Sequence, residues 1–269
     1  AAMVDPNPQV AGKGLGRLQE AGIPAEHGLL EAQARALNPG FVKRMETGRP
    51  WVRCKLAMSL DGRTAMASGE SKWITGEDAR RDVHRLRARS SAIVTGVGTV
   101  LADDPALTAR LDDMEIERQP LRVVVDTHLS LPLDARLLRQ PGRTLVMTCS
   151  DDNDAREALE ANGAEVVQLP YCSDVVDMAV VLDTLGELEV NEVLVETGAT
   201  LSGAMLQADL IDELVVYVAP LLMGHEARPL FRLPGLGSMD DRIELELRDQ
   251  RMVGRDMRLT FEVVGRKGE

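Results

Sequence analysis

A regular alternation of short apolar runs with amphipathic stretches, between residues 51 and 220, constrains the fold more than any other feature. The apolar runs are rich in Val, Leu and Ile and predict buried strands over residues 51–58, 91–96, 121–126, 144–148, 164–169, 192–196 and 213–220. Helices are predicted between them over residues 76–90, 151–163, 175–188 and 199–210. Parallel strands need a crossover, usually a helix, so this rhythm predicts an α/β fold with a mostly parallel sheet flanked by helices.

The last part of the chain has a different pattern. Residues 242–253 and 255–264 alternate apolar with polar positions at period two on either side of Gly254. This alternation predicts two antiparallel strands joined as a hairpin. Because the hairpin is expected to join the parallel strands, the whole sheet is predicted to be mixed.

The first 50 residues do not share the alternation. Residues 12–22 and 29–46 place apolar residues at roughly helical spacing, and residues 23–28 between them could form a short strand. Residues 47–50, Thr-Gly-Arg-Pro, then break the pattern. The opening AAMVDPNP resembles the end of a strand with nothing before it to pair with, so we expect the chain to begin inside a truncated upstream domain.

The charge and composition narrow the classes of partner. The chain carries 31 Lys and Arg against 43 Asp and Glu, a net charge of -12 at pH 7, and 3% aromatic residues. This balance disfavours nucleic-acid backbones and anionic membranes as partners, and the scarcity of aromatic rings disfavours a base-stacking platform. The sequence has neither a secretory signal pattern nor a run of about eighteen apolar residues, so a cytoplasmic location is expected.

The cysteines and histidines do not support a metal site. The three cysteines are too few and too widely spaced for a disulfide framework or for paired zinc ligands, so we interpret them as small apolar fillers. The four histidines never fall at the spacing of roughly three to five residues that directs two imidazoles to one metal ion. We therefore expect no metal.

Small residues follow the predicted strand at 192–196, at the end of a strand where ligands gather in open α/β sheets. The run Thr-Gly-Ala-Thr-Leu-Ser-Gly-Ala over residues 197–204 leads into a helix and leaves its first amides free for an anion such as a cofactor diphosphate. Close packing of the helix against the strand explains the same run equally well. Glu196, which ends the strand, either caps the helix or recognises a ligand hydroxyl or ring nitrogen.

Charged residues in three other places have both a structural and a functional interpretation. Lys55 lies within a strand that otherwise looks buried, and a buried ammonium is costly without an anion to pair with, although its stem could snorkel. The helix at 76–90 carries five arginines, which usually mark a solvated face but also suit a phosphate-bearing small molecule. Thr99, Asp103 and Arg110 lie in a turn-prone stretch, where Asp103 could cap a turn and Arg110 could be solvated.

Three separated motifs carry a resemblance to a known family: KLAMSLDGRTAMASGESKWIT from residue 55, GVGTVLADDPALTAR from residue 96, and VETGATLSGAMLQADLIDELVVYVAPLLMG from residue 195. Residues 50–264 resemble the reductase domain of the bifunctional riboflavin-biosynthesis deaminase/reductase. From this resemblance, we expect residues 49–269 to form an NADPH-dependent reductase domain. We expect residues 1–48 to be the C-terminal remnant of a cytidine-deaminase-like domain. Zinc deaminases need a His-x-Glu and a Pro-Cys-x-x-Cys, and because this sequence has neither, the chain is expected not to deaminate.

The resemblance also implies a dihydrofolate-reductase-like fold, a homodimer, and NADPH as the cofactor. It implies reduction of the phosphoribosyl group of 5-amino-6-(5-phosphoribosylamino)uracil to a ribityl chain. The residues implied to line the NADPH site are Ala57, Trp73, Thr99, Asp103, Gly198, Ala199, Thr200, Leu201, Ser202, Gly203 and Ala204. The residues implied to face the substrate are Ser71, Arg87, Leu107, Arg110 and Glu196. Thr127 is a weak candidate for the cofactor's 2′-phosphate.

Lys55 and Glu196 are the predicted catalytic residues. We expect Lys55 to polarise or protonate the opening sugar and Glu196 to recognise the substrate ring or hydroxyls. Asp61, followed by Gly62, is interpreted as a turn former. Two other interpretations remain open: a reductase of the same fold that acts on another pterin or pyrimidine, and a catalytically silent nucleotide-binding module. The presence of Lys55, Arg87, Arg110 and Glu196 argues against the silent module.

Overall fold

The computed structural model describes residues 1–112, 115–170 and 175–265 of the chain. These residues belong to two compact units. The larger unit comprises residues 52–181 and 193–269, and the smaller unit comprises residues 1–51 and 182–192.

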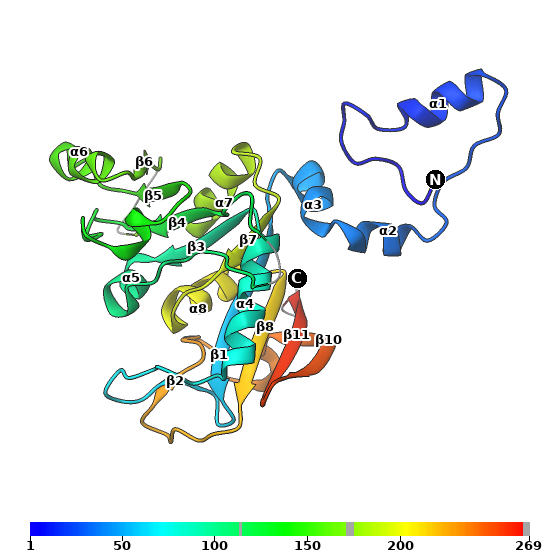
Figure 1. The fold of residues 1–269 in the computed structure, drawn as a ribbon. Coiled ribbons are helices and arrows are strands. Elements are labelled where there is room, and N and C mark those ends of the chain that lie inside the picture. The colour runs from blue at the N-terminus through cyan, green and yellow to red at the C-terminus, as the bar shows by residue number, and fades with distance from the viewer. Residues whose placement is uncertain (113–114, 171–174, 266–269) are drawn as a thin grey trace. The chain divides into compact units, whose positions relative to one another are not determined.

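The fold is built on a nine-stranded sheet with the order β10-β11-β8-β1-β7-β3-β4-β5-β6 (Figure 1). Its strands are β1 (Trp51–Ser59), β3 (Ala92–Gly96), β4 (Leu121–Val125), β5 (Thr144–Thr148), β6 (Glu165–Gln168), β7 (Glu192–Val195), β8 (Glu213–Ala219), β10 (Glu244–Val253) and β11 (Asp256–Gly265). β1 and β8 are parallel, as are β7, β3, β4, β5 and β6, whereas β11 pairs antiparallel with both β8 and β10. The predicted mixed, mostly parallel sheet with a C-terminal antiparallel hairpin is confirmed.

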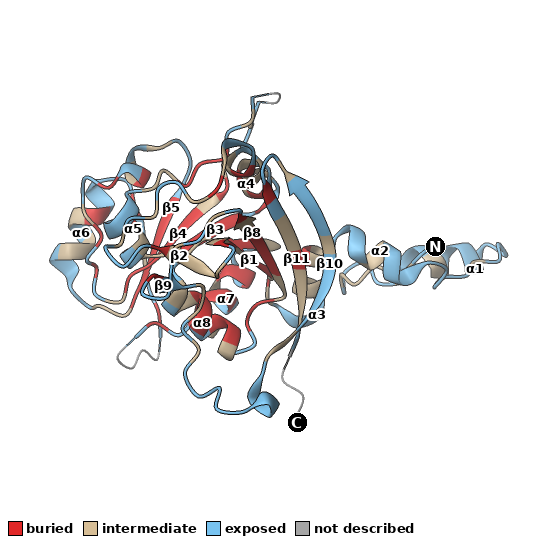
Figure 2. Cartoon of the chain, turned by 90° about the horizontal axis from the view of Figure 1, so that it is seen from below, coloured by how far each residue is buried: buried red, intermediate tan, exposed pale blue. Residues whose placement is uncertain are grey.

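Helices complete the α/β architecture on both faces of the sheet. They are α4 (Glu77–Arg89), α5 (Val97–Asp103), α6 (Asn153–Ala161), α7 (Met178–Glu187) and α8 (Ala199–Gln207). Figure 2 shows α4 on one side of the strands and α8 on the other. α4 buries Ala79, Val83 and Leu86, the face predicted from the sequence, and this face belongs to a core cluster with Tyr217 and Leu194 of the sheet. Acidic residues in its first turn and basic residues in its last turn complement the helix dipole.

Several short elements were not predicted. The stretch around Thr99 and Asp103, expected to be a turn, forms the helix α5. The helix ends at Asp103, and Asp104 after it has a left-handed φ of 41°. β2 (Arg63–Ala65) and β9 (Arg228–Pro229) pair as a small antiparallel sheet, and η1 (Arg136–Arg139) and η2 (Met239–Asp241) are short 3₁₀ helices. Such elements are too short to show a periodic pattern of apolar residues.

The interpretation of the cysteines as apolar fillers is correct at one position and wrong at another. Cys54 is free and fully buried on β1, and burial raises the pKa of its thiol to about 12. Cys149 is disulfide-bonded instead. The small number of cysteines therefore did not exclude a single bridge.

The first 51 residues, which belong to the smaller unit, contain three helices, α1 (Lys13–Glu20), α2 (Glu31–Leu37) and α3 (Pro39–Thr47). The single helix predicted over residues 29–46 is broken at Asn38 because Pro39 pushes the preceding residue out of the helical region, to φ -143° and ψ 61°. The strand predicted over residues 23–28 is wrong, since these residues have no regular secondary structure. α1 and α2 contain no buried residue, and Figure 2 colours them mostly exposed.

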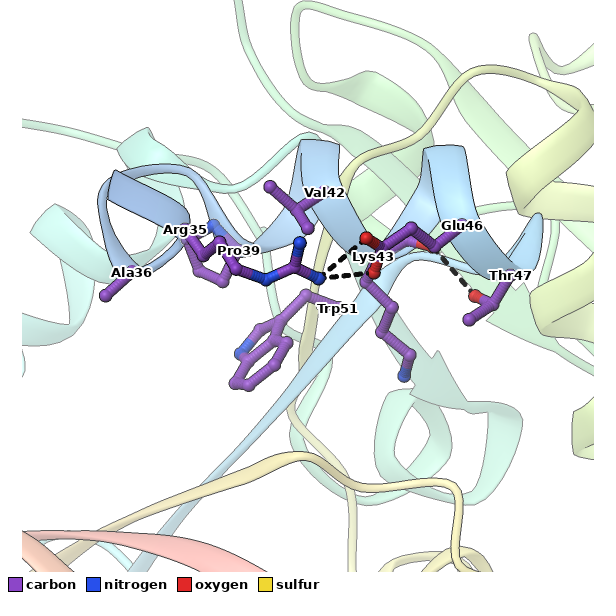
Figure 3. Close-up of a pocket in the computed structure, with 8 residues that line it drawn as sticks. All are labelled: Arg35, Ala36, Pro39, Val42, Lys43, Glu46, Thr47 and Trp51. Atoms are coloured by element: carbon purple, nitrogen blue, oxygen red, sulfur yellow. Dashed lines mark hydrogen bonds and ion pairs between the residues drawn. The ribbon is translucent and has the colours of Figure 1, made fainter. Parts of the chain in front are cut away.

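A hollow of about 320 Å³ opens within the smaller unit (Figure 3). Its lining residues are Arg35, Ala36, Pro39, Val42, Lys43, Glu46, Thr47 and Trp51. Arg35 Nη2 donates to both carboxylate oxygens of Glu46, at 2.7 and 2.5 Å. None of the site residues predicted from the sequence lines this hollow.

Candidate functional site

The candidate site lies at the edge of the sheet where β7, β3 and β4 end. These strands are parallel neighbours, so the residues that follow them meet at one edge. Glu196 follows β7, and its backbone is held to β3: its N–H donates to the carbonyl of Val94 at 2.9 Å, and its carbonyl accepts from Thr95 Oγ1 at 2.7 Å. α5 starts directly after β3, and α8 starts at Ala199. The topology therefore brings two helix N-termini close to one carboxylate.

A buried ion pair joins α4 to the end of β7. Arg87 Nε and Nη2 donate to Glu196 Oε1 and Oε2 at 2.6 and 2.8 Å, and Arg87 Nη1 donates to the Thr108 carbonyl at 3.1 Å. The two side chains are only 14% and 13% exposed. Burial alone would lower the pKa of Arg87 and raise that of Glu196, but their attraction outweighs it, so the pKa of Arg87 rises and that of Glu196 falls. The pair therefore stays charged, and the Glu196 carboxylate binds Arg87.

Lys55 lies half-buried on β1, with its charge close to that pair. Its Nζ is 5.8 Å from the centre of the Tyr217 ring, and the Tyr217 hydroxyl donates to Asp82 Oδ2 at 2.6 Å. Burial lowers the pKa of Lys55, with Arg87 adding to the effect and Glu196 opposing it. The Lys55 ammonium therefore holds its proton less tightly than an ordinary lysine does.

His84 and Arg110 form a second group beside this cluster, and sequence reasoning did not include His84. Arg110 is exposed, and its Nη2 lies 3.4 Å from His84 Nε2. His84 Nδ1 lies 3.1 Å from the Thr108 carbonyl, the same group that accepts from Arg87. Because His84 and Arg87 are three residues apart on α4, they share one helix face. That spacing is the signal that could have identified His84.

The N-terminus of α8 is open. Its N-cap residue, Gly198, provides no side-chain cap, and a Cβ placed there would meet no heavy atom within 4 Å. Ala199, Thr200, Leu201 and Ala204 are half-buried or exposed, whereas Ser202 and Gly203 are buried. A Cβ at Gly203 would lie 2.1 Å from the carbonyl oxygen of Arg232, so this glycine is required for packing. Close packing therefore explains Gly203, whereas the open space at Gly198 is what the anion-binding interpretation requires, and that interpretation stays a prediction.

Two predicted cofactor residues, Trp73 and Asp103, are linked through Lys72. Lys72 Nζ donates to the Asp103 carbonyl at 3.3 Å and lies 3.7 Å from its carboxylate. The Trp73 ring is 66% exposed, and the guanidinium of Arg80 lies 4.5 Å from its centre. The structure therefore brings the loop before α4 close to the end of α5.

The remaining predicted residues have varied surroundings. Leu107 is 2% exposed within the core cluster, so its side chain is not available to a substrate. Ala57 packs against the same cluster on β1, while Ser71 and Thr99 are half-buried in the loop before α4 and in α5. Thr127 follows β4, and its carbonyl accepts from Thr148 Oγ1 at 3.1 Å.

Asp61 connects two loops, in agreement with its interpretation as a turn residue. Its carboxylate accepts hydrogen bonds from the Ser59 hydroxyl and from the amides of Met223 and Gly224. The hydrogen bond from Ser59 is the largest cause that lowers the pKa of Asp61, to about 2. Because its oxygens are occupied in this way, Asp61 is not a candidate acid.

Comparison with known proteins decides the family. The sequence model of the RibD C-terminal domain family matches residues 50–259. The chain belongs to this family. It is 47% identical over 267 residues to riboflavin biosynthesis protein RibD of Escherichia coli (strain K12), a match that covers 96% of this chain and 72% of that protein. The predicted role as a reductase of riboflavin biosynthesis is thereby confirmed.

Solved structures agree with this membership. Acinetobacter baumannii RibD, form 1, superimposes with a TM-score of 0.88 at 44% identity, over 98% of this chain and 72% of that one. The Thermotoga maritima diaminohydroxyphosphoribosylaminopyrimidine deaminase/5-amino-6-(5-phosphoribosylamino)uracil reductase superimposes with a TM-score of 0.80 at 27% identity, over 97% of this chain and 70% of that one. The fold seen here is therefore the fold of these relatives.

Two kinds of feature are absent from the residues that the structure describes. Over residues 1–112, 115–170 and 175–265, no three or more His, Cys, Asp or Glu side chains gather in a way that could hold a metal ion. Within the same residues, no helix has the length and apolar character needed to cross a bilayer.

Proposed function

We propose that this chain reduces the phosphoribosyl group of 5-amino-6-(5-phosphoribosylamino)uracil to a ribityl chain at the expense of NADPH. The Thermotoga maritima relative is named as the reductase of that compound. The observation that carries the proposal is the arrangement on either side of Glu196. Its carboxylate pairs with Arg87 near the Lys55 ammonium, and the uncapped α8 begins three residues later.

The cofactor is a nicotinamide nucleotide, and we assign its diphosphate to the N-terminus of α8. The residues present fit such a group, because the first turn lacks a side-chain cap and Gly198 leaves open space in front of it. When bound, NADPH supplies a hydride for C1′ of the opened sugar. We assign Trp73 and Asp103 to a second wall for this nucleotide, because Lys72, which precedes Trp73 in the sequence, contacts Asp103. The preference for NADPH over NADH is part of the proposal.

Lys55 has the properties needed to handle the proton of this reduction. Opening the sugar breaks the bond between C1′ and the ring oxygen, which takes a proton. The nitrogen lone pair forms the second C1′–N bond, and the nitrogen keeps its own proton, so the hydride adds to a protonated imine. The Lys55 ammonium, with a pKa lowered mainly by burial, is a better donor than an ordinary lysine. Within the Arg87–Glu196 pair, the Glu196 carboxylate stabilises the Lys55 ammonium before transfer, while Arg87 opposes this effect.

Arg110 is the proposed ligand of the substrate phosphate. Arg87 was predicted to share this role, but all three of its nitrogens already donate to Glu196 or Thr108. Arg110 is exposed, and a planar guanidinium can hold two phosphate oxygens at once. We therefore assign Arg87 to positioning Glu196 and assign Arg110 to the phosphate.

The test is to mix the purified chain with NADPH and the phosphoribosylaminouracil and to follow both the loss of reduced-nicotinamide absorbance and the mass of the product. The expected result is oxidation of NADPH with formation of the ribitylamino product. The same assay with a dihydropterin distinguishes a reductase of another substrate. A silent nucleotide-binding module would bind NADPH without oxidising it in either assay.

The sequence resemblance also concerns the domains, the location, the oligomeric state and the lack of deaminase activity. We propose that residues 1–48 derive from a deaminase-like domain and residues 49–269 form the reductase domain, in the cytoplasm. The family match beginning at residue 50 supports this division. We also propose a homodimer, because β10 is an edge strand with Leu245, Leu247 and Met252 exposed. Light scattering on the purified chain measures the oligomeric state.

We also propose that this chain does not deaminate. Release of ammonia from the aminopyrimidine would contradict that proposal.

A further inference from the structure

His84 lies beside Arg110 but has no part in the reduction as proposed. Its Nδ1 is 3.1 Å from the Thr108 carbonyl, and its Nε2 is 3.4 Å from Arg110 Nη2. A carbonyl can only accept, so Nδ1 carries the ring proton and Nε2 has a lone pair directed to the guanidinium. The neutral imidazole and Arg110 are therefore already hydrogen-bonded to each other.

The two groups differ in how firmly they are held. His84 belongs to α4 and is half-buried, and the Thr108 carbonyl that it contacts also accepts from Arg87. Arg110 is exposed, and its guanidinium is free to adjust around a ligand. An anion that binds Arg110 from solvent therefore also meets Nε2 of a fixed imidazole.

Three charged groups act on His84. They are Arg87 on the same helix, Arg110 on the segment after α5, and Glu196 at the end of β7. Burial and the two arginines lower the pKa of His84, while the Thr108 carbonyl and Glu196 oppose them. A phosphate dianion held by Arg110 would add two negative charges on the Nε2 side, which favours the imidazolium.

We propose that His84 is a second ligand of the substrate phosphate beside Arg110, and that its imidazole takes up a proton from solvent when the phosphate binds. This proposal rests on the proposed function, since it takes the phosphoribosyl substrate as the ligand. On binding, Nε2 changes from accepting the Arg110 N–H to donating to a phosphate oxygen. The released Arg110 N–H turns to another oxygen of the same phosphate.

The proposal has a defined pH dependence. Phosphate binding raises the pKa of His84, so the contribution of His84 to affinity is complete below the pKa of the free protein. It is lost as the pH rises through the pKa of the complex. One charge-assisted hydrogen bond corresponds to a loss of about tenfold in affinity over that range.

The first experiment follows the histidine resonances by NMR with ribose 5-phosphate as the probe and ribose as its control. The chain has four histidines, and a His84→Gln variant assigns the resonance of His84 by its absence. The expected result is that ribose 5-phosphate, but not ribose, moves the titration midpoint of His84 to higher pH. An unmoved midpoint under saturating ribose 5-phosphate would overturn the proposal, and so would a failure of ribose 5-phosphate to bind.

The second experiment measures the pH dependence of ribose 5-phosphate affinity in the parent, His84→Gln and His84→Ala. Glutamine keeps a hydrogen-bond donor but cannot titrate, so His84→Gln should lose the tenfold pH dependence. His84→Ala should bind weakly at every pH. NADPH affinity and the thermal melt should match the parent in both variants, and a parent-like pH dependence in His84→Gln would overturn the proposal. If ribose 5-phosphate binds as expected but the reductase assay shows no turnover, the result contradicts the proposed function and leaves the proposal for His84 standing.

Discussion

The charged cluster of Lys55, Arg87 and Glu196 and the N-terminus of α8 adjoin each other at Glu196, yet they are built in opposite ways. In the cluster, the Arg87 and Glu196 side chains are almost fully buried and bind each other through two hydrogen bonds. The start of α8 has no side-chain cap, and Gly198 faces open space.

The difference follows from the cost of burying charge. A buried charge must be paired before any ligand arrives, since an unpaired one costs several kcal/mol. The free backbone amides of a helix N-terminus are solvated by water until an anion displaces that water. Such a binding site therefore needs only open space in front of the amides. We infer that the cluster acts on the reacting atoms and that the α8 N-terminus holds the cofactor.

The largest expected effect comes from removing the Lys55 ammonium. If Lys55 is the proton donor, Lys55→Met should lower kcat by roughly 100- to 10,000-fold, because methionine keeps most of the stem but has no proton to give. NADPH affinity should stay at the parent value. In the parent, kcat should fall as the pH rises through a pKa below the usual lysine range, since the protonated form is active. Steady-state kinetics with a thermal melt measure this, and a parent-like kcat would remove Lys55 from the mechanism.

The next effect is on stability, and it tests the pairing within the cluster. Glu196→Gln leaves the Arg87 guanidinium buried beside a neutral group, so the free energy of unfolding should fall by about 3 to 5 kcal/mol. The matched Arg87→Met/Glu196→Gln double variant removes both charges and should lose less stability than the sum of the losses in Arg87→Met and Glu196→Gln. Denaturant unfolding of all four proteins measures the coupling. Strictly additive losses would mean that the pair contributes no stability.

A smaller effect is expected at Arg110, outside the buried pair. Arg110→Gln removes one charge-assisted contact to the substrate phosphate, so KM should rise with kcat little changed, by about 2 to 3 kcal/mol in binding. The dephosphorylated ribosylaminouracil should show no such difference between parent and variant. Steady-state kinetics with both substrates decide this, and an equal loss on both would place Arg110 away from the phosphate.

The smallest effect is expected at the α8 N-terminus. Gly198→Val has room in the free protein, so it should fold normally but weaken NADPH binding by about tenfold by occupying the space proposed for the diphosphate. Gly203→Ala is the matched control, because its Cβ would meet the Arg232 carbonyl: it should lower the melting temperature. Fluorescence titration of NADPH separates the two variants. If Gly198→Val binds NADPH as tightly as the parent does, residues 197–204 have only a packing role.

Much of the fold could be predicted from the sequence, because the central parallel strands β3, β4, β5 and β7 are almost entirely buried and so appear as apolar runs. β2, β9 and α5 could not, since two to seven residues show no clear period. The position of Glu196 after β7 was also predictable, because ligands gather at strand ends. The pairing of Glu196 with Arg87, 109 residues away, was not, and neither was the contact of His84 with Arg110. Such contacts depend on how α4 packs, which spacing along the chain does not specify.

The central claim is that the cluster and the α8 N-terminus together form one reductase site. The most direct test uses NADPH with deuterium in both C4 positions of the nicotinamide and the phosphoribosylaminouracil as substrate, followed by mass spectrometry of the product. With the parent protein, we expect a product that carries a single deuterium, at C1′ of the ribityl chain. Product without deuterium, deuterium at any other carbon, or no product at all would contradict it.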